Sequence, residues 1–399
     1  MRLLHTSDWH LGRSLHGHSL AAAQQAAVDF IVALAITRDV DCLVIAGDVF
    51  DRAIPPIEAL RLLNRAIDAL ASNGISVIIT AGNHDSGDRL ATYSGVLEQG
   101  VTLVGSLDGI GTPVVLADEF GDVLVYPLPY LEPDVARVTL AADAEPLQRS
   151  HDAVMSAAIG RIAADIAVRG LQAPGAGIRA IAVGHAFVVG ASDIPRSDDT
   201  TELTSESERD LTVGGVQVVP ATVFAGVGLH YVALGHLHRG HQVRAADPVV
   251  RYSGSPLRYS LSESTHDKHV LIVDIGAPGT DCVVTEVAVP QPRPMSRLRD
   301  SMEALLSEAH EDARDHFVEL LVTDDLYPDR MHARLDTAFP YSLRKQHEPA
   351  NRAGLERDRG DARGQAPLDV VSDFFVKVTG YAPDADQADF LRAGYEATR

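Results

Sequence analysis

The chain has 399 residues, of which 46% are hydrophobic and 22% charged, with a formal net charge of −21 at pH 7. No apolar run approaches the roughly 20 residues of a membrane helix, and the first residues lead into a strand pattern, so we expect no membrane segment. Both cysteines lie in apolar runs, which does not favour a disulfide and fits a reducing compartment. We therefore expect a cytoplasmic protein. The acidic balance argues against a chain that binds nucleic acid by itself, because such binding depends on clustered Lys and Arg.

Short apolar runs and helical patterns alternate over the first part of the chain. The apolar runs, typical of buried parallel strands, occupy residues 3–6, 42–46 and 75–79. Apolar residues at helical spacing follow them over residues 21–37, 55–72 and 87–99. This alternation predicts a doubly wound, layered α/β fold.

Further strands and one long helix are expected in the middle of the chain. The strands are predicted around Val114 and Val123 and at residues 180–183 and 231–234, and the helix at residues 145–169. An antiparallel pattern then follows at residues 242–244, 249–252, 270–275 and 282–289. Residues 192–210, rich in Ser, Thr, Asp and Glu, form either a mobile flap or a plain solvated connection.

Prolines at positions 290, 292 and 294 interrupt the strand pattern and indicate a domain boundary. We expect a main domain at residues 1–289, a small α+β domain at 290–350, a flexible linker at 351–365 and two amphipathic helices within 366–399. The small domain should hold a strand at 317–322, a helix at 328–339 and a strand near Leu343. The apolar side of the first terminal helix, 367–379, either docks on a partner or folds back on its own domain.

Polar side chains follow five of the predicted strands. Because the carboxyl ends of parallel strands gather at one edge of a sheet, we expect these side chains to converge. They are Asp8, His10, Asp48, Asn83, His84, Asp85, His185, His236 and His238. A single residue of this kind at a strand end is more often structural, whereas their joint occurrence indicates a metal centre.

Seven of these side chains divide into two ligand sets that share one carboxylate. The sets are Asp8, His10 and His238 for one ion, Asn83, His185 and His236 for the other, and Asp48 as the bridge. Carboxylate, amide and imidazole donors without a thiolate suit Mn²⁺, Fe²⁺, Zn²⁺ or similar ions. Two ions roughly 3.5–4 Å apart clamp a phosphate and lower the pKa of a shared water.

His84 is not needed as a ligand, so it can protonate the oxygen that leaves the phosphate. Asp85 is expected to orient the ring of His84. Arg13, Tyr252 and Ser253 lie near the predicted site and are candidate phosphate contacts, with structural roles as the alternative.

Together these motifs resemble the five signature blocks of the calcineurin-like metallophosphoesterases. Within that superfamily the chain is most similar to the nuclease subunits of SbcCD-type complexes. The likeness is carried by residues 6–12, 46–51, 231–238 and 252–256, with 208–210 and 214–215 ahead of the last metal motif. It covers residues 1–275 closely and depends on element order beyond Pro294.

The resemblance implies two mixed β-sheets flanked by helices, a small α+β capping domain and terminal helices that bind a partner. It implies cleavage of DNA phosphodiesters with two Mn²⁺ ions, with Mg²⁺, Fe²⁺ or Zn²⁺ as alternatives. The expected activities are a double-strand exonuclease and a single-strand or hairpin endonuclease that serve DNA repair, replication and recombination. Archaeal relatives carry a histidine where this chain has Asp51, so no role of that histidine transfers.

The implied assembly is a homodimer within a heterotetramer that contains an SbcC-type coiled-coil ATPase. The dimer faces would be the helical stripes at Leu60–Leu70 and Leu90–Leu97, with burial in the chain's own core as the alternative. The net negative charge is compatible with a nuclease, because bound cations and a partner subunit can supply positive charge.

Two other functions use the same metal motifs. One is a phosphatase or cyclic-nucleotide phosphodiesterase of the superfamily, and the other is a scaffold in which the metal only stabilises the fold.

Overall fold

A computed structural model describes residues 1–92, 94, 100–143, 145–172, 177–190, 218–244, 247–349, 366–379 and 382–396. The chain divides into two compact units, with the boundary between Ser296 and Arg297, except that residues 315–317 belong to the first unit. The loop predicted at 192–210 and the linker predicted at 351–365 lie outside the described residues.

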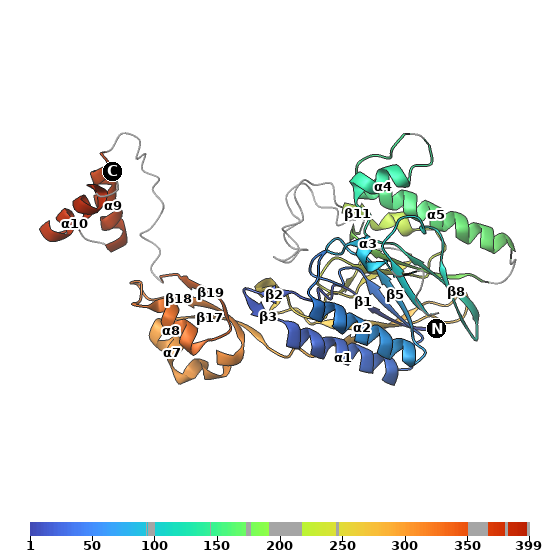
Figure 1. Cartoon of the computed structure of the whole chain (residues 1–399), viewed down its shortest axis with the longest axis horizontal. Helices are drawn as coiled ribbons and strands as arrows, with labels where there is room; N and C mark the ends of the chain where they lie inside the picture. The colour runs from blue at the N-terminus through green and yellow to red at the C-terminus, as the bar shows by residue number, and fades with distance from the viewer. Residues whose placement is uncertain are drawn as a thin grey trace. The chain divides into compact units, whose positions relative to one another are not determined.

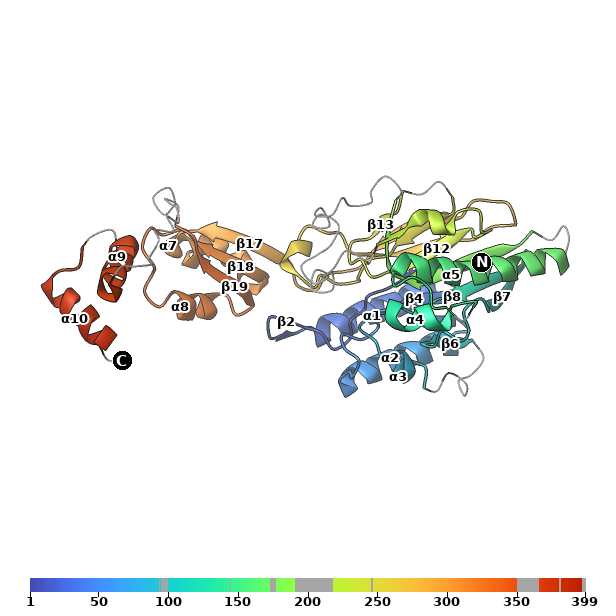
Figure 2. The same cartoon turned by 90° about the horizontal axis from the view of Figure 1, so that it is seen from above.

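Two six-stranded mixed sheets form the centre of the first unit (Figure 1 and Figure 2). In the first sheet the strand order is β16 (Val283–Ala288), β15 (His269–Asp274), β1 (Arg2–Thr6), β4 (Cys42–Ala46), β5 (Ser76–Thr80) and β6 (Val101–Val104). Strands β1, β4, β5 and β6 are parallel, whereas β15 is antiparallel to both β1 and β16.

The second sheet also combines a parallel centre with antiparallel edges. Its order is β13 (His241–Gln242), β14 (Val249–Tyr252), β12 (Tyr231–Gly235), β9 (Arg179–His185), β8 (Gly121–Pro127) and β7 (Val114–Asp118). Strand β14 is antiparallel to β13, as predicted for the chain after His238, but it also pairs in parallel with β12, which the sequence pattern did not predict. A short parallel pair, β10 (Phe187–Val189) and β11 (Val218–Pro220), lies beside this sheet.

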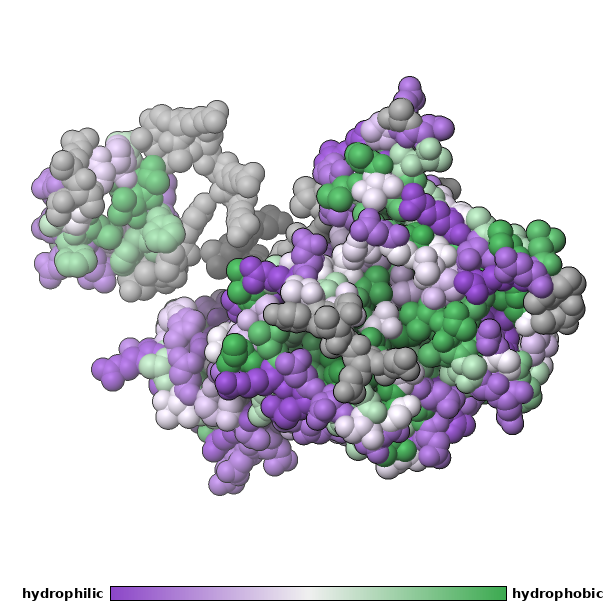
Figure 3. Space-filling model, turned by 45° about the vertical axis from the view of Figure 1, so that its right-hand side comes forward, coloured by the Kyte–Doolittle hydropathy of each residue, from purple (hydrophilic) through white to green (hydrophobic). Residues whose placement is uncertain are grey.

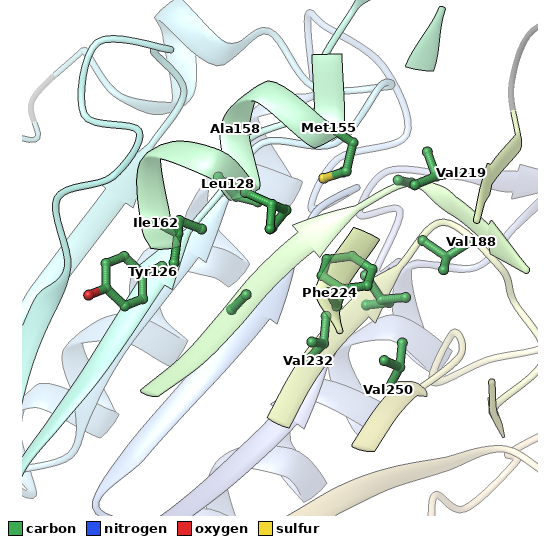
Figure 4. Packing of buried hydrophobic residues seen from close by; sticks show 14 of the residues in the cluster. Tyr126, Leu128, Met155, Ala158, Ile162, Val188, Val219, Phe224, Val232 and Val250 are labelled. Carbon is green, nitrogen blue, oxygen red and sulfur yellow. The ribbon is translucent and has the colours of Figure 1, made fainter. Parts of the chain in front are cut away.

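Helices cover the outer faces of the two sheets. The predicted helices α1 (Ala21–Thr37) and α2 (Ile57–Ser72) pack on each other, and α2 contacts β5 of the first sheet. Helix α5 (His151–Gln172) covers the second sheet, and Figure 4 shows its Met155, Ala158 and Ile162 close to Tyr126 and Leu128. A short helix, α4 (Pro133–Thr139), which the sequence pattern did not reveal, packs against α5.

Two predicted helix boundaries need correction. The helix predicted to start at residue 145 begins at His151, because the hydroxyl of Ser150 accepts a hydrogen bond from the Ala153 amide and caps the helix there. The helix predicted over 87–99 is only α3 (Gly87–Leu90) within the described residues, and the chain turns at residues 91–92. Tyr93 and Leu97, which were expected on its apolar stripe, lie outside the described residues.

The inner faces of the two sheets pack directly on each other. Val44 and Ile78 of the first sheet share one buried cluster with Val125, Ile181 and Ala233 of the second. This packing holds the sheets face to face. The prediction of a layered α/β fold with two mixed sheets flanked by helices is therefore confirmed.

Apart from the first residues of β17 and β18, the second unit contains a three-stranded sheet of β17 (Met295–Asp300), β18 (Phe317–Val322) and β19 (Ser342–His347), with helices α7 (Met302–Leu306) and α8 (Met331–Ala338). Leu305, Leu320, Leu335 and Phe339 are among the residues of its core.

The terminal helices α9 (Pro367–Thr379) and α10 (Ala385–Glu396) contact each other. Hydrophobic residues gather on the surface of this helix pair (Figure 3), where Phe374 is 67% and Phe390 79% exposed. No helix within the described ranges is long and apolar enough to cross a membrane.

Candidate metal centre

The structure brings the seven predicted ligands together where the carboxyl ends of β1, β4, β5, β9 and β12 meet. In the first predicted set, one donor atom each from Asp8, His10 and His238 lies within 4.8 Å of the others. The Nε2 atoms of the two imidazoles are only 3.1 Å apart, and all three side chains are buried. Burial lowers the pKa of His10 well below its ordinary value, which keeps the ring neutral, as a metal ligand must be.

The second predicted set converges on the amide oxygen of Asn83. Asn83 Oδ1 lies 2.9 Å from His185 Nε2 and 3.1 Å from His236 Nδ1. Burial lowers the pKa of His236 to about 3, so its ring is also neutral. These oxygen and nitrogen donors at short mutual distances fit divalent cations.

Asp48 lies between the two sets. Its Oδ2 is 3.4 Å from His185 Nε2 and 3.7 Å from His10 Nε2, while its Oδ1 accepts a hydrogen bond of 2.9 Å from the His84 amide. Burial opposes the charged ring of His185, yet the adjacent Asp48 carboxylate and Asp8 raise the pKa of that ring to about 9. A cation bound here would displace this proton, because ligand histidines bind metals in the neutral form.

The backbone is strained at the same place. Asp8, His10, Asp48 and His236 all have positive φ angles, between 43° and 101°. Non-glycine residues rarely adopt this conformation, and such strain persists where the surrounding structure enforces it, often at functional sites. Gly82 is required beside them, because a Cβ atom at that position would collide with the Asp48 side chain.

His84 lies at the accessible edge of the centre. Its side chain is 23% exposed, its Nε2 is 4.0 Å from Asp48 Oδ2, and its ring meets that of His10 edge-on. Its Nδ1 is 3.0 Å from the carbonyl oxygen of Asp51, so the Nδ1–H donates to that oxygen.

The expected pairing of Asp85 with His84 needs correction. The Asp85 carboxylate instead accepts hydrogen bonds from the amides of Val49, Phe50 and Gly82, at 2.9–3.1 Å. Its role is thus to tie the loop after β5 to the loop after β4. Burial, with repulsion from Asp48, raises the pKa of Asp85 to about 6.

Two of the three candidate phosphate contacts are buried away from solvent. Tyr252 is fully buried, and its hydroxyl donates to Ala186 O at 2.7 Å and accepts from the Val188 amide at 2.6 Å. Ser253 is also buried, with its Oγ 2.8 Å from Ser7 Oγ. The expectation that Tyr252 and Ser253 contact a phosphate was wrong, because both side chains point into the core.

Arg13 is half-buried beside the centre. Its guanidinium donates to Asp51 Oδ1 at 2.9 Å and lies 5.3 Å from the centre of the Tyr259 ring. Asp51 therefore orients two side chains. Its carboxylate holds Arg13, and its carbonyl oxygen holds the ring of His84.

A buried ion pair behind His238 was missed in the sequence. Glu263 Oε1 lies 3.3 Å from His238 Nδ1, and Lys268 Nζ donates to Glu263 Oε2 at 2.6 Å and to the His238 carbonyl oxygen at 2.8 Å. Burial disfavours a charged carboxylate, but Lys268 and His238 hold the pKa of Glu263 well below its ordinary range. Neither residue follows a predicted strand, so the strand-end criterion could not select them.

Comparison with known proteins identifies the family of the chain. Residues 1–132 match the model of the calcineurin-like phosphoesterases, and residues 291–379 match a model described as the Type 5 capsule protein repressor C-terminal domain. The chain is 32% identical to the SbcD component of the SbcCD nuclease from Bacillus subtilis, over 97% of this chain and 95% of that protein. It belongs to the SbcD family of nuclease subunits.

Two further SbcD relatives support this assignment. The SbcD protein from Escherichia coli K12 is 31% identical over 77% of this chain and 73% of its own length. That from Rhodobacter capsulatus is 32% identical over 77% of this chain and 74% of its own length. The predictions of the family and of a metal-dependent nuclease with a metallophosphoesterase domain are therefore confirmed.

Proposed function

We propose that this SbcD-family chain hydrolyses DNA phosphodiester bonds with two divalent ions, Mn²⁺ first among them and Mg²⁺, Fe²⁺ or Zn²⁺ as alternatives. The observation that supports this most is the position of Asp48, whose Oδ2 lies within 3.4 Å of His185 Nε2 and 3.7 Å of His10 Nε2. A carboxylate between two donor sets is suited to bridge two cations. When bound, such a pair clamps a phosphate and lowers the pKa of the attacking water.

His84 serves as the proton donor to the leaving oxygen. Its Nδ1–H is committed to the Asp51 carbonyl oxygen, so Nε2 is the atom that carries the transferable proton. Because the His84 side chain is 23% exposed, Nε2 can reach a DNA strand that approaches from solvent. The His84 amide at the same time holds Asp48 Oδ1 and fixes the bridging carboxylate.

The proposed substrate range and partners are those that the resemblance to SbcCD-type nuclease subunits implies. The chain acts as a double-strand exonuclease and a single-strand or hairpin endonuclease in cytoplasmic DNA repair, replication and recombination. It works as a homodimer with an SbcC-type ATPase, and α9 and α10 bind that partner. The exposed Phe374 and Phe390 give this helix pair an apolar surface suited to a helical partner.

The activity is tested with labelled duplex and hairpin DNA in the presence of Mn²⁺. We expect nucleotide release that a chelator stops and that His84→Gln lowers by about 10²–10⁴-fold, the usual contribution of a general acid. The control His332→Gln changes an exposed histidine of α8 and should behave as wild type. Turnover of phosphomonoesters or cyclic nucleotides without DNA cleavage would instead indicate the phosphatase or cyclic-nucleotide phosphodiesterase function.

A further inference from the structure

A pocket of about 420 Å³, within the range of small-molecule sites, is lined by the segments that directly follow His185 and His236 in the chain. One wall is β10 with Gly190, and the other is the segment from Leu237 to Arg244. Its floor is apolar, because Phe187, Val188 and Val243 are all buried. Its polar lining includes Arg239 and Arg244, both of which are exposed at the rim.

Tyr252 connects the two walls of the pocket through hydrogen bonds and ring stacking. The Tyr252 hydroxyl bonds Ala186 O and the Val188 amide of the first wall. The His241 ring of the second wall stacks on the Tyr252 ring, with centroids 4.9 Å apart and planes 22° apart. His241 Nδ1 also lies 2.8 Å from the Arg239 carbonyl oxygen, so the loop that carries Arg239 is held in place. Tyr252 thus shapes this pocket rather than contacting phosphate itself.

The charge of the pocket is opposite to that of the chain. The chain has a net charge of −21, yet the pocket lining contains two arginines and no carboxylate among the described residues. Neither Arg239 nor Arg244 makes an ion pair within the part of the chain that the structure describes. Such cations beside an apolar floor are complementary to a ligand that has both an anionic and an apolar part.

Both walls continue directly from proposed metal ligands. Phe187 comes two residues after His185, and Arg239 immediately follows His238. A nucleotide held in the pocket would therefore lie next to the phosphate at the metal centre. We propose that this pocket binds the nucleotide adjacent to the scissile bond, with its base or sugar on the apolar floor and its phosphate at Arg239 and Arg244.

This inference rests on the proposed nuclease function and names one of its substrate subsites. It is tested with the double variant Arg239→Ala/Arg244→Ala and two substrates. One is a single-stranded oligonucleotide, and the other is the ester bis(p-nitrophenyl) phosphate, which carries no nucleoside on either side of its phosphate. The quantity compared is the ratio of kcat/KM for the oligonucleotide to kcat/KM for the ester. Removing two charge-assisted contacts should lower this ratio about tenfold or more. Metal content, measured by mass spectrometry, reports whether the neighbouring ligands are intact.

Arg38→Ala is the matched control, because Arg38 is an exposed arginine at the far end of α1, and it should keep the wild-type ratio. A ratio that stays at the wild-type value in a metal-loaded double variant overturns the proposal. Equal losses on both substrates also overturn it, since the arginines would then serve the fold or the metal centre. If the wild-type chain hydrolyses the ester but not the oligonucleotide, the proposed nuclease function itself fails.

As a second measurement, 2-aminopurine is placed on either side of the scissile phosphate and bound to the His84→Gln variant. Burial of the base on the apolar floor should change its emission on one side only. This change should be lost when the two arginine substitutions are added. An emission change of the same size on both sides, or one that survives the substitutions, contradicts a single adjacent-nucleotide subsite.

Discussion

His238 is contacted from both sides, by His10 within the metal centre and by the buried pair Glu263 and Lys268 behind it. A carboxylate on the far nitrogen of a ligand histidine fixes its tautomer and raises its basicity, so we expect Glu263→Gln to weaken metal affinity about 10–100-fold. Calorimetric titration of the metal-free protein with Mn²⁺ measures this. Affinity equal to wild type would show that the pair is only structural.

Glu263→Gln also leaves Lys268 buried without its partner, which costs about 3–5 kcal/mol of stability. The double variant Glu263→Gln/Lys268→Met removes both charges and should recover much of that stability. Because it still lacks the carboxylate, its metal affinity should remain low. This comparison separates the effect on the ligand from the effect on folding.

His5 illustrates a histidine with a structural role. Its ring is fully buried between the Tyr231 hydroxyl, 2.9 Å away, and the Leu234 carbonyl oxygen, and burial lowers its pKa to about 3. The unfolded ring takes a proton near pH 6.5, so the unfolded chain binds more protons between about pH 6.5 and 3. Stability should therefore fall as the pH is lowered through this window, by on the order of 4 kcal/mol from this group.

Urea unfolding of the metal-free protein at several pH values measures this effect. His5→Gln should be less stable at neutral pH and should lose less stability on acidification than the wild type. Parallel pH profiles for the two proteins would mean that His5 does not resist protonation.

For single residues, the sequence predicted which side chains converge better than it predicted the contacts that support them. Asp8 and His236 follow strands, and their position and type are visible in the sequence. Glu263 acts through a contact that forms only when the chain folds, and Tyr252 points inward although it lies close to the motif. Side-chain direction and long-range partners depend on tertiary packing, which a strand-end pattern does not contain.

Helix α2 has a buried side and an exposed side. Its apolar stripe was interpreted either as a dimer face or as part of the chain's own core. Leu63 and Leu70 are buried in the chain's own core, whereas Leu60 is 37% and Ile57 54% exposed. Leu63→Ala should therefore lower the unfolding free energy by about 2–4 kcal/mol, and Leu60→Ala by less than about 1 kcal/mol. Equal losses in chemical unfolding would contradict this division.

The exposed side of α2 is the part that can join two copies of the chain. Ile57→Glu places a charge there without touching the core and should shift the proposed homodimer toward monomer, as measured by light scattering after size exclusion. Leu63→Ala serves as the control for lost stability without a changed surface. An unchanged mass for Ile57→Glu would exclude this side of the helix from the dimer.

Most elements could be predicted from apolar spacing, as the agreement for α1 and α2 shows. What could not be predicted depended on information other than apolar spacing. The Ser150 cap determines where α5 starts, and the folded chain determines that β14 pairs in parallel with β12 as well as antiparallel with β13. A hydrophobic pattern alone contains neither the cap nor the partner.

In the whole molecule, the five motif-bearing strands are shared between two stacked sheets rather than one. The run of apolar residues in β4 resembles that in β9, so the pattern does not show which sheet each joins. Only the resemblance to the metallophosphoesterases indicated two sheets. The packing of Val44 and Ile181 in one cluster shows how these sheets are held together.

The net charge of −21 is a property of the whole chain and predicts weak DNA binding by the protein without its partner. Fluorescence anisotropy with duplex DNA should give a shallow dependence of affinity on salt, because few phosphates are neutralised. Adding an SbcC-type partner should increase both the affinity and the salt slope. Tight, steeply salt-dependent binding by the isolated chain would contradict this prediction.

We propose that side chains from five strands hold two cations around Asp48. Anomalous diffraction from a crystal of the protein soaked with Mn²⁺ tests it most directly. We predict two peaks roughly 3.5–4 Å apart, one near Asp8, His10 and His238, the other near Asn83, His185 and His236, with Asp48 in contact with both. A single peak, or peaks that do not contact Asp48, would contradict the account.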